Sequence, residues 1–377
     1  MKHIAISKVF IHSFLILIAI SYSSCTNEED CCSPKTPKDS SFDREAMLTQ
    51  WAENIIIPAF EDYASALKDL AVAQDNFAAD PSADQLAAMR DDYINAYLAW
   101  QSVSLFDIGR AESIALRNKS NIFPTSEEKI AANIESSDYN LELPSNFVAQ
   151  GLPAIDYLLY GIADEDADIL NILSEPNYEL YLATLINRLD VITDDVLTDW
   201  KDNYKAEFIS NQASSATGSI DKLVNDAIFY YEKFLRAGKI GIPAGVFSGN
   251  TIMAAIEAPY SGIYSKEFFD EGLNSFQNFF NGTSVTGRPD SQSLRHYLDY
   301  LGAEKDGVLL SELINDQLNK ARTAAIELSG DLQNQIYEDN SKMLNTYDEL
   351  QKAVVLLKVD MLQALNIKVD FVDADGD

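Results

Sequence analysis

Apolar side chains recur every three to five residues along most of this chain, and that helical period constrains the fold more than any other feature. One stripe consists of Trp51, Ile55, Phe60, Tyr63, Leu67 and Leu70. A second stripe runs from Leu86 to Ser104, with Ser82 as its expected N-cap. Pro58 interrupts the first stripe and predicts a kink or a break there. The period as a whole predicts an all-α fold.

The other helical patterns fall into two halves of the chain. They cover 126–134, a stretch after 151–153, 178–208, 220–237, 265–280, 291–301, 309–328 and 332–365. The polar segment Ser210–Ser219 separates the two sets, so we expect two helical bundles, over residues 42–212 and 213–377. The apolar alternation at Ile367–Val372 is the one place where the pattern allows a strand.

The N-terminus has the pattern of a bacterial signal peptide. Lys2 and Lys8 give it a positive start, and the apolar run Val9–Ile20 is too short to span a membrane. Small residues then lead into Cys25, in a pattern that resembles the lipobox of bacterial lipoproteins. We therefore expect a signal peptide over residues 1–24 and a lipid on Cys25.

The polar segment that follows reads as a flexible tether over residues 25–41. Its acidic run Glu28–Asp30 resembles a surface-export signal of lipoproteins, and a simple solvated tether is the alternative. The lipid anchor predicts a protein attached to the outer membrane, facing either the periplasm or the cell exterior.

Composition excludes several kinds of chemistry. The formal net charge of -31 argues against a nucleic-acid partner. No Cys follows Cys32, and beyond the expected signal peptide His296 is the one His, so neither a cysteine nor a two-His zinc site can form. No nucleotide-binding glycine loop occurs. Carboxylate and tyrosine oxygens remain, and hard cations such as ferric iron or calcium prefer oxygen ligands.

Several segments together resemble one known family, the imelysin-like proteins. They are Ala96-Tyr97-Leu98-Ala99-Trp100-Gln101 with Phe106 and Gly109 to Glu112 after it, Asn121-Ile122-Phe123-Pro124-Thr125 with Lys129-Ile130, Gln150 to Gly161, Lys239 to Phe247, and the closing Asp375-Gly376-Asp377. The resemblance spans the whole mature chain. It implies two helical bundles, a place in the periplasm or outer membrane, and a role in iron or haem uptake.

The family signature is Gly-x-His-x-x-Glu, and the family is classed with metallopeptidases. The matching positions here are Gly151, Pro153 and Asp156. Pro153 has no lone pair to offer a metal, whereas Asp156 keeps a carboxylate. The resemblance therefore implies Asp156 as a metal ligand and argues against peptide hydrolysis. From the matching segments, Trp100, Arg110 and Glu112 are expected as neighbours of that site.

The residues around Asp156 allow a structural interpretation as well. Pro153 suits the first turn of a helix, and Asp156 then lies on a largely apolar face with Leu152 and Leu159. A carboxylate in such a place needs a partner, which Arg110, backbone amides or a metal could supply. Three functions stay open: capture of iron, haem or an iron-bearing partner at the membrane; a scaffold with a decayed metal site; and a metallopeptidase.

Overall fold

The computed structural model describes residues 42–371 apart from 285, 289 and 291. The expected signal peptide, the lipidated Cys25 and the tether lie outside the described residues, as do residues 372–377. The described residues belong to one unit, Phe42–Asp377. No helix in the described part of the chain is long and apolar enough to cross a membrane.

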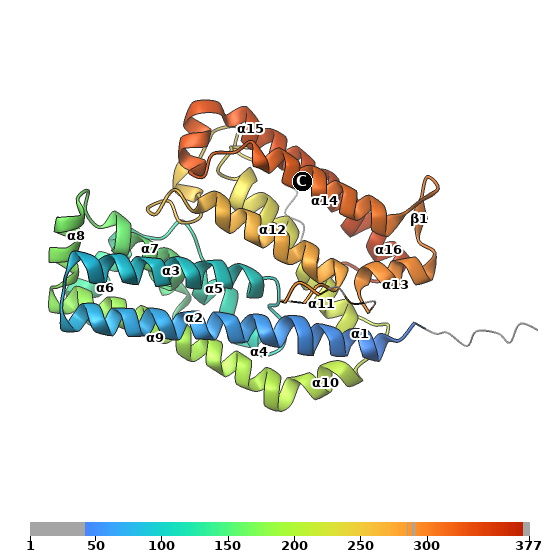
Figure 1. The fold of residues 1–377 in the computed structure, drawn as a ribbon, viewed down its shortest axis with the longest axis horizontal. Helices are drawn as coiled ribbons and strands as arrows, with labels where there is room; N and C mark the ends of the chain where they lie inside the picture. The colour runs from blue at the N-terminus through green and yellow to red at the C-terminus, as the bar shows by residue number, and fades with distance from the viewer. Residues whose placement is uncertain (1–41, 285, 289, 291, 372–377) are drawn as a thin grey trace, which may run out of the picture. The chain divides into compact units, whose positions relative to one another are not determined.

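The prediction of an all-α fold is confirmed, and the helices form two groups (Figure 1). In the first group α2 packs against both α3 and α9. The elements of this group are α1 (Arg44–Trp51), η1 (Ala52–Ile56), α2 (Ile57–Ala79), α3 (Ala83–Val103), α4 (Arg110–Ser113), α5 (Leu116–Ser120), α6 (Glu127–Ser136), η2 (Pro144–Ala149), α7 (Gly151–Asp156), η3 (Tyr157–Gly161), α8 (Asp166–Leu173), α9 (Pro176–Asp199), η4 (Trp200–Tyr204) and α10 (Lys205–Ser210).

In the second group α14 packs against α15 and α12. Its elements are α11 (Ser219–Phe229), η5 (Tyr230–Gly241), η6 (Met253–Ala255), α12 (Ser265–Asn281), α13 (Leu294–Leu301), β1 (Glu304–Lys305), β2 (Val308–Leu309), α14 (Leu310–Ile326), α15 (Leu332–Val354), η7 (Val355–Met361) and α16 (Leu362–Leu365). The loop between α10 and α11 falls on the expected boundary, while the division into two domains at 212/213 stays a prediction.

Two local expectations differ from the structure in detail. The first concerns Pro58, where the expected break does not occur and a π-helical turn precedes the proline. The chain runs from α1 through the π-helical turn η1 into α2, and Pro58 lies in the first turn of α2. The wider π-helical turn accommodates the proline ring, and the hydrogen bond that the missing N–H cannot make is not needed there. The helix therefore continues past Pro58. The second concerns the strand allowed at 367–372: its described residues, Ile367–Phe371, form none, and the short antiparallel pair β1–β2 lies elsewhere.

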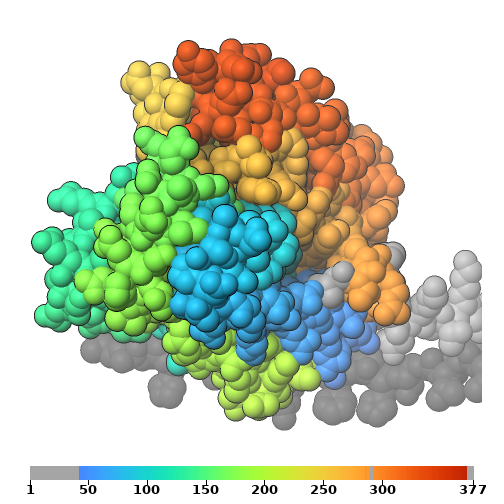
Figure 2. Space-filling view, turned by 60° about the vertical axis from the view of Figure 1, so that its left-hand side comes forward, coloured from blue at the N-terminus to red at the C-terminus, as the bar shows by residue number. Residues whose placement is uncertain are grey.

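The two groups of helices meet along α3 and α12. The ring of Tyr97 on α3 stacks on Phe268 of α12 with ring centroids 4.3 Å apart, and both side chains are fully buried. In the space-filling view the C-terminal helices, orange and red, cover one side of the N-terminal helices, blue and green (Figure 2). The polar groups described below lie at this junction.

Candidate functional site

The signature segment begins at a tight backbone contact. Gly151 has φ +76°, and a Cβ placed on it would lie 2.3 Å from the carbonyl oxygen of Ser120. Only glycine tolerates both the positive φ and this approach. Pro153 follows in the first turn of α7, as predicted, and is buried. The segment therefore packs closely against the end of α5.

The Asp156 carboxylate is fully buried at the end of α7. Its Oδ2 accepts a hydrogen bond from the backbone N–H of Tyr260 at 3.0 Å, and its Oδ1 accepts one from the N–H of Ser261 at 3.2 Å. Burial raises the pKa of Asp156 to about 6, and the hydrogen bonds from Ser261 and Tyr260 limit the rise. Backbone amides thus supply the partner that this carboxylate needs, and Asp156 holds the loop before α12 against α7.

The other predicted site residues have different partners. Arg110 is exposed and pairs with Asp195 at 2.8 Å. Glu112 is exposed and lines a separate cavity beside α11. Trp100 is buried and lines a small cavity that Asp156 does not line. The hydrogen bonds and ion pairs of the described residues join none of these three side chains to Asp156.

A buried polar cluster lies beside this loop, and sequence reasoning did not find it. Its centre is the ion pair between Lys239 of η5 and Glu257, whose side chains are 4% and 2% exposed. Gln101 Oε1 accepts from Lys239 at 2.9 Å, and Asn121 donates to Glu257 at 2.7 Å. Tyr97 donates in turn to Asn121 at 2.7 Å. We call these five residues the polar junction.

The polar junction brings together residues from distant segments of the sequence. Tyr97 and Gln101, Asn121, and Lys239 come from three of the segments that carry the resemblance. Burial lowers the pKa of Lys239, and the carboxylate of Glu257 opposes that change. In the sequence, nothing marks Glu257 as a functional residue except that it is an acid within the apolar stretch 254–258.

The small cavity beside the polar junction cannot hold haem. It measures about 10 Å³ and is lined by Trp100 and Tyr230, among other residues. Such a volume is about that of one water molecule.

The signature segment also does not fit a metal ion. Each oxygen of Asp156 accepts a backbone N–H, and the side chain of Pro153 has no atom that can bind a metal. Among residues 42–371 with their three gaps, no group of three or more His, Cys, Asp or Glu side chains could hold a metal. We therefore assign no metal chemistry to this segment.

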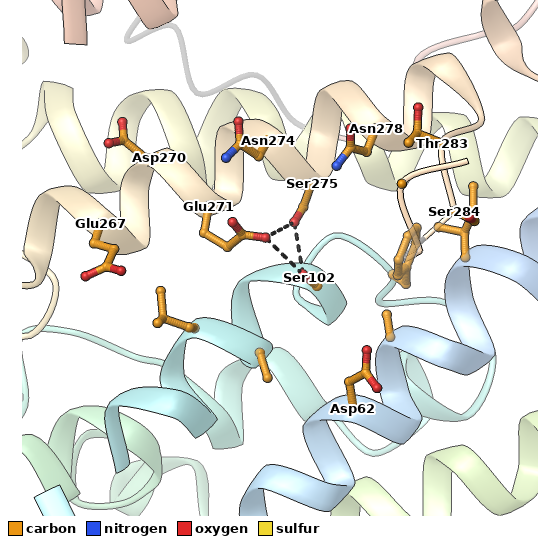
Figure 3. A pocket seen from close by; sticks show the side chains of 16 residues that line it. Asp62, Ser102, Glu267, Asp270, Glu271, Asn274, Ser275, Asn278, Thr283 and Ser284 are labelled. Atoms are coloured by element: carbon orange, nitrogen blue, oxygen red, sulfur yellow. Dashed lines mark hydrogen bonds between the residues drawn. The ribbon is translucent and has the colours of Figure 1, made fainter. Parts of the chain in front are cut away.

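A much larger cavity lies elsewhere, between the α2–α3 pair and α12, and measures about 600 Å³ (Figure 3). We call it the α3–α12 cavity. Its apolar lining consists of Ile55, Ala59, Leu98, Ala99 and Phe106, and its polar lining of Asp62, Ser102, Glu267, Asp270, Glu271, Asn274, Ser275, Asn278, Thr283 and Ser284, with Gly287. Its volume is in the range of small-molecule sites.

Acidic side chains dominate the polar part of this cavity. Glu271 Oε1 accepts hydrogen bonds from the hydroxyls of Ser275 at 3.3 Å and Ser102 at 3.5 Å. Figure 3 shows Glu267 and Glu271 projecting from α12 and Asp62 projecting from α2. Partial burial and the nearby Glu61 raise the pKa of Asp62. Among the described residues, no Lys, Arg or His side chain lines the cavity.

The described residues form an all-α protein with a buried polar junction and a separate cavity of about 600 Å³. The Imelysin family model (peptidase M75) matches residues 56–360, so the chain belongs to the imelysin family. The comparison with curated proteins gives no match.

Two solved structures share this fold. An imelysin-like protein from Psychrobacter arcticum 273-4 is 20% identical with a TM-score of 0.68, and the match covers 87% of this chain and 97% of that chain. A "putative iron-regulated protein A precursor" from Parabacteroides distasonis ATCC 8503 is 16% identical with a TM-score of 0.70, covering 84% and 94%.

Proposed function

We propose that this protein is a lipid-anchored component of iron acquisition that acts by binding an iron-bearing ligand outside the cytoplasm. Membership of the imelysin family and the name of an iron-regulated neighbour support the iron-related role. The lipobox-like pattern at Cys25 supports the anchor in the outer membrane, on its periplasmic or exterior face. The ligand could belong to one of four classes: bare iron, haem, an iron chelate or an iron-bearing protein partner.

One observation supports the proposed location of the binding site. The Asp156 carboxylate is fully engaged by the amides of Tyr260 and Ser261, whereas the α3–α12 cavity is open and about 600 Å³ in volume. A ligand can enter this cavity without breaking the contacts that hold the loop. We therefore place binding in the α3–α12 cavity and assign the signature segment a structural role.

Peptide hydrolysis has little support from the described residues. Pro153 stands where the family has its His, and the ring of His296 lies against the hydroxyl of Ser293 at 2.8 Å in α13. A scaffold without any ligand is the second candidate, favoured by the way Asp156 serves packing alone. It predicts that no iron-bearing ligand binds.

Calorimetric titration separates these functions. The mature protein would be titrated with ferric iron, calcium, zinc, haem and a ferric trihydroxamate chelate, and the series repeated with Asp156→Asn and with Glu267→Gln/Glu271→Gln. Binding of the cationic chelate that survives Asp156→Asn and weakens in the double variant supports the proposal, and so does binding of haem that survives Asp156→Asn and changes in the double variant. Loss of binding in Asp156→Asn, with its fold intact by circular dichroism, would place the site at the signature segment. No binding by the wild type would favour the scaffold.

The anchor has its own test. Mass spectrometry of the N-terminal peptide from membranes should find diacylglycerol on Cys25 as the first residue. An unmodified Cys25, or cleavage at another position, would contradict the proposed anchor.

A further inference from the structure

The charged side chains that line the α3–α12 cavity are all acidic. Of its four carboxylates, Asp270 pairs with Lys266, which stands outside the lining. Asp62, Glu267 and Glu271 form no ion pair with another described residue, and the serine hydroxyls that contact Glu271 carry no charge. The cavity therefore presents negative charge to whatever enters it.

The apolar wall adds a second requirement on the ligand. Ile55, Leu98 and Phe106 line the same cavity as the carboxylates. Transfer of methylene groups from water to such a wall is favourable, and carboxylates that remain partly solvated attract a cation at its mouth. A compact metal ion would use only the acids, which are too dispersed for three of them to hold one ion. The lining suits a molecule with an aliphatic part and a positive group.

We infer that the α3–α12 cavity selects a positively charged, aliphatic ferric chelate, such as a linear trihydroxamate that carries a free primary amine. The inference rests on the proposed function and names the class of ligand for the same site. In a ferric trihydroxamate, three deprotonated hydroxamates balance Fe³⁺, so the core is neutral and the ammonium group gives the complex a charge of +1. Haem carries two propionates, and anionic chelates would likewise meet the carboxylates of the cavity with like charge.

A matched series of chelates tests the selection. The probes are one linear ferric trihydroxamate with its amine free, the same chelate with the amine acetylated, and the same chelate with the amine succinylated, with complex charges of +1, 0 and -1. The iron centre and the methylene chain are the same in all three, so the series changes chiefly the charge. Affinities would be measured with the mature protein at low and at high NaCl concentration.

We expect the +1 chelate to bind at least about tenfold more tightly than the -1 chelate, because opposite charges attract at a partly solvated site. Its affinity should fall as salt screens the carboxylates. Glu267→Gln/Glu271→Gln should remove most of the preference while keeping side-chain size. The control Glu135→Gln/Glu338→Gln makes the same charge change at exposed positions outside the cavity and should leave the preference intact.

The outcomes separate this inference from the proposed function. Equal binding of all three chelates, unaffected by salt, would overturn the charge selection and leave iron-ligand binding in place. A preference that falls equally in the control variant would assign the effect to net charge and overturn the role of the cavity. Absence of binding by every chelate and by haem would overturn both proposals.

Discussion

At the scale of single residues, the signature segment works as a clamp. Gly151 allows α7 to start against the Ser120 carbonyl, and Asp156 closes the other end by accepting two backbone N–H groups. Each buried donor left without an acceptor costs about 1–3 kcal/mol. Replacement of the family His by Pro153 leaves this clamp intact, because Pro153 lies in the first turn of α7 and needs no N–H partner.

The raised pKa of Asp156 predicts a pH dependence of stability. The pKa rises from 3.8 to about 6 on folding, so the folded state binds the proton more tightly than the unfolded state. The contribution of Asp156 is fully present below the unfolded pKa and is lost as pH rises through about 6. The free energy of unfolding of wild type minus that of Asp156→Asn should fall by about 2 kcal/mol between pH 4 and pH 7.5.

Urea unfolding followed by circular dichroism measures this difference. The subtraction removes the effects of groups present in both proteins, such as Glu142, whose pKa the ion pairs with Arg188 and Lys119 lower to about 2. A difference that stays constant with pH would show that the pKa of Asp156 is not raised.

Gly151→Ala tests the close approach at the start of the clamp. The new Cβ would lie 2.3 Å from the Ser120 oxygen at positive φ, so we expect a loss of more than about 3 kcal/mol. Gly302→Ala is the matched control, because Gly302 also has positive φ, +63°, with no atom within 4 Å of its new Cβ. It should cost only about 1 kcal/mol. Equal losses in urea unfolding would refute the steric argument.

At the scale of elements, the polar junction ties η5 to the loop before α12 and to α3. Lys239 and Glu257 pair out of water, and Gln101 and Asn121 fill their remaining hydrogen-bonding positions. A buried pair of this kind contributes less to net stability than to the choice of one arrangement, since desolvation offsets the attraction. Its clearer signature is the cost of removing one partner.

A double-mutant cycle measures that cost. Lys239→Met and Glu257→Gln should each destabilise the protein by about 3–5 kcal/mol, because each leaves the other group buried without its partner. The double variant should lose less than the sum of the two, with a coupling energy of about 2 kcal/mol or more. Additive losses in urea unfolding would show that the two side chains do not act as a pair.

At the scale of the whole molecule, the two groups of helices share buried surface. Tyr97 of α3 stacks on Phe268 of α12, and the polar junction draws residues from both groups. Separation of the groups would expose these aromatic rings and an ion pair to water. We therefore expect the two groups to unfold together.

Tryptophan fluorescence makes this expectation testable. The chain has three Trp residues, Trp51, Trp100 and Trp200, and all of them lie in the first group and are buried. Fluorescence therefore reports the first group, whereas far-ultraviolet circular dichroism reports both. The two urea transitions should have the same midpoint. A fluorescence midpoint distinct from the dichroism midpoint would show that the bundles unfold independently.

The sequence by itself determined the helices, because the apolar period and the N-caps are local signals. Ser82 caps α3 and Ser126 caps α6 through hydrogen bonds to amides three residues on, within the same turn of chain. The family resemblance likewise came from short segments. Pro58 shows where prediction from local signals ends. The sequence reveals that its N–H is missing, but not that a π-helical turn accommodates the proline.

Only the tertiary structure decided how the site is built. Gln101, Asn121, Lys239 and Glu257 are far apart in the chain and meet because helices pack, which no local period encodes. The sequence allowed Arg110, backbone amides or a metal as the partner of Asp156. The tertiary structure decides for the amides of Tyr260 and Ser261, because their loop packs against α7. The α3–α12 cavity exists only between packed elements. Contacts of this kind depend on long-range packing, whereas helix formation depends on neighbours a few residues away.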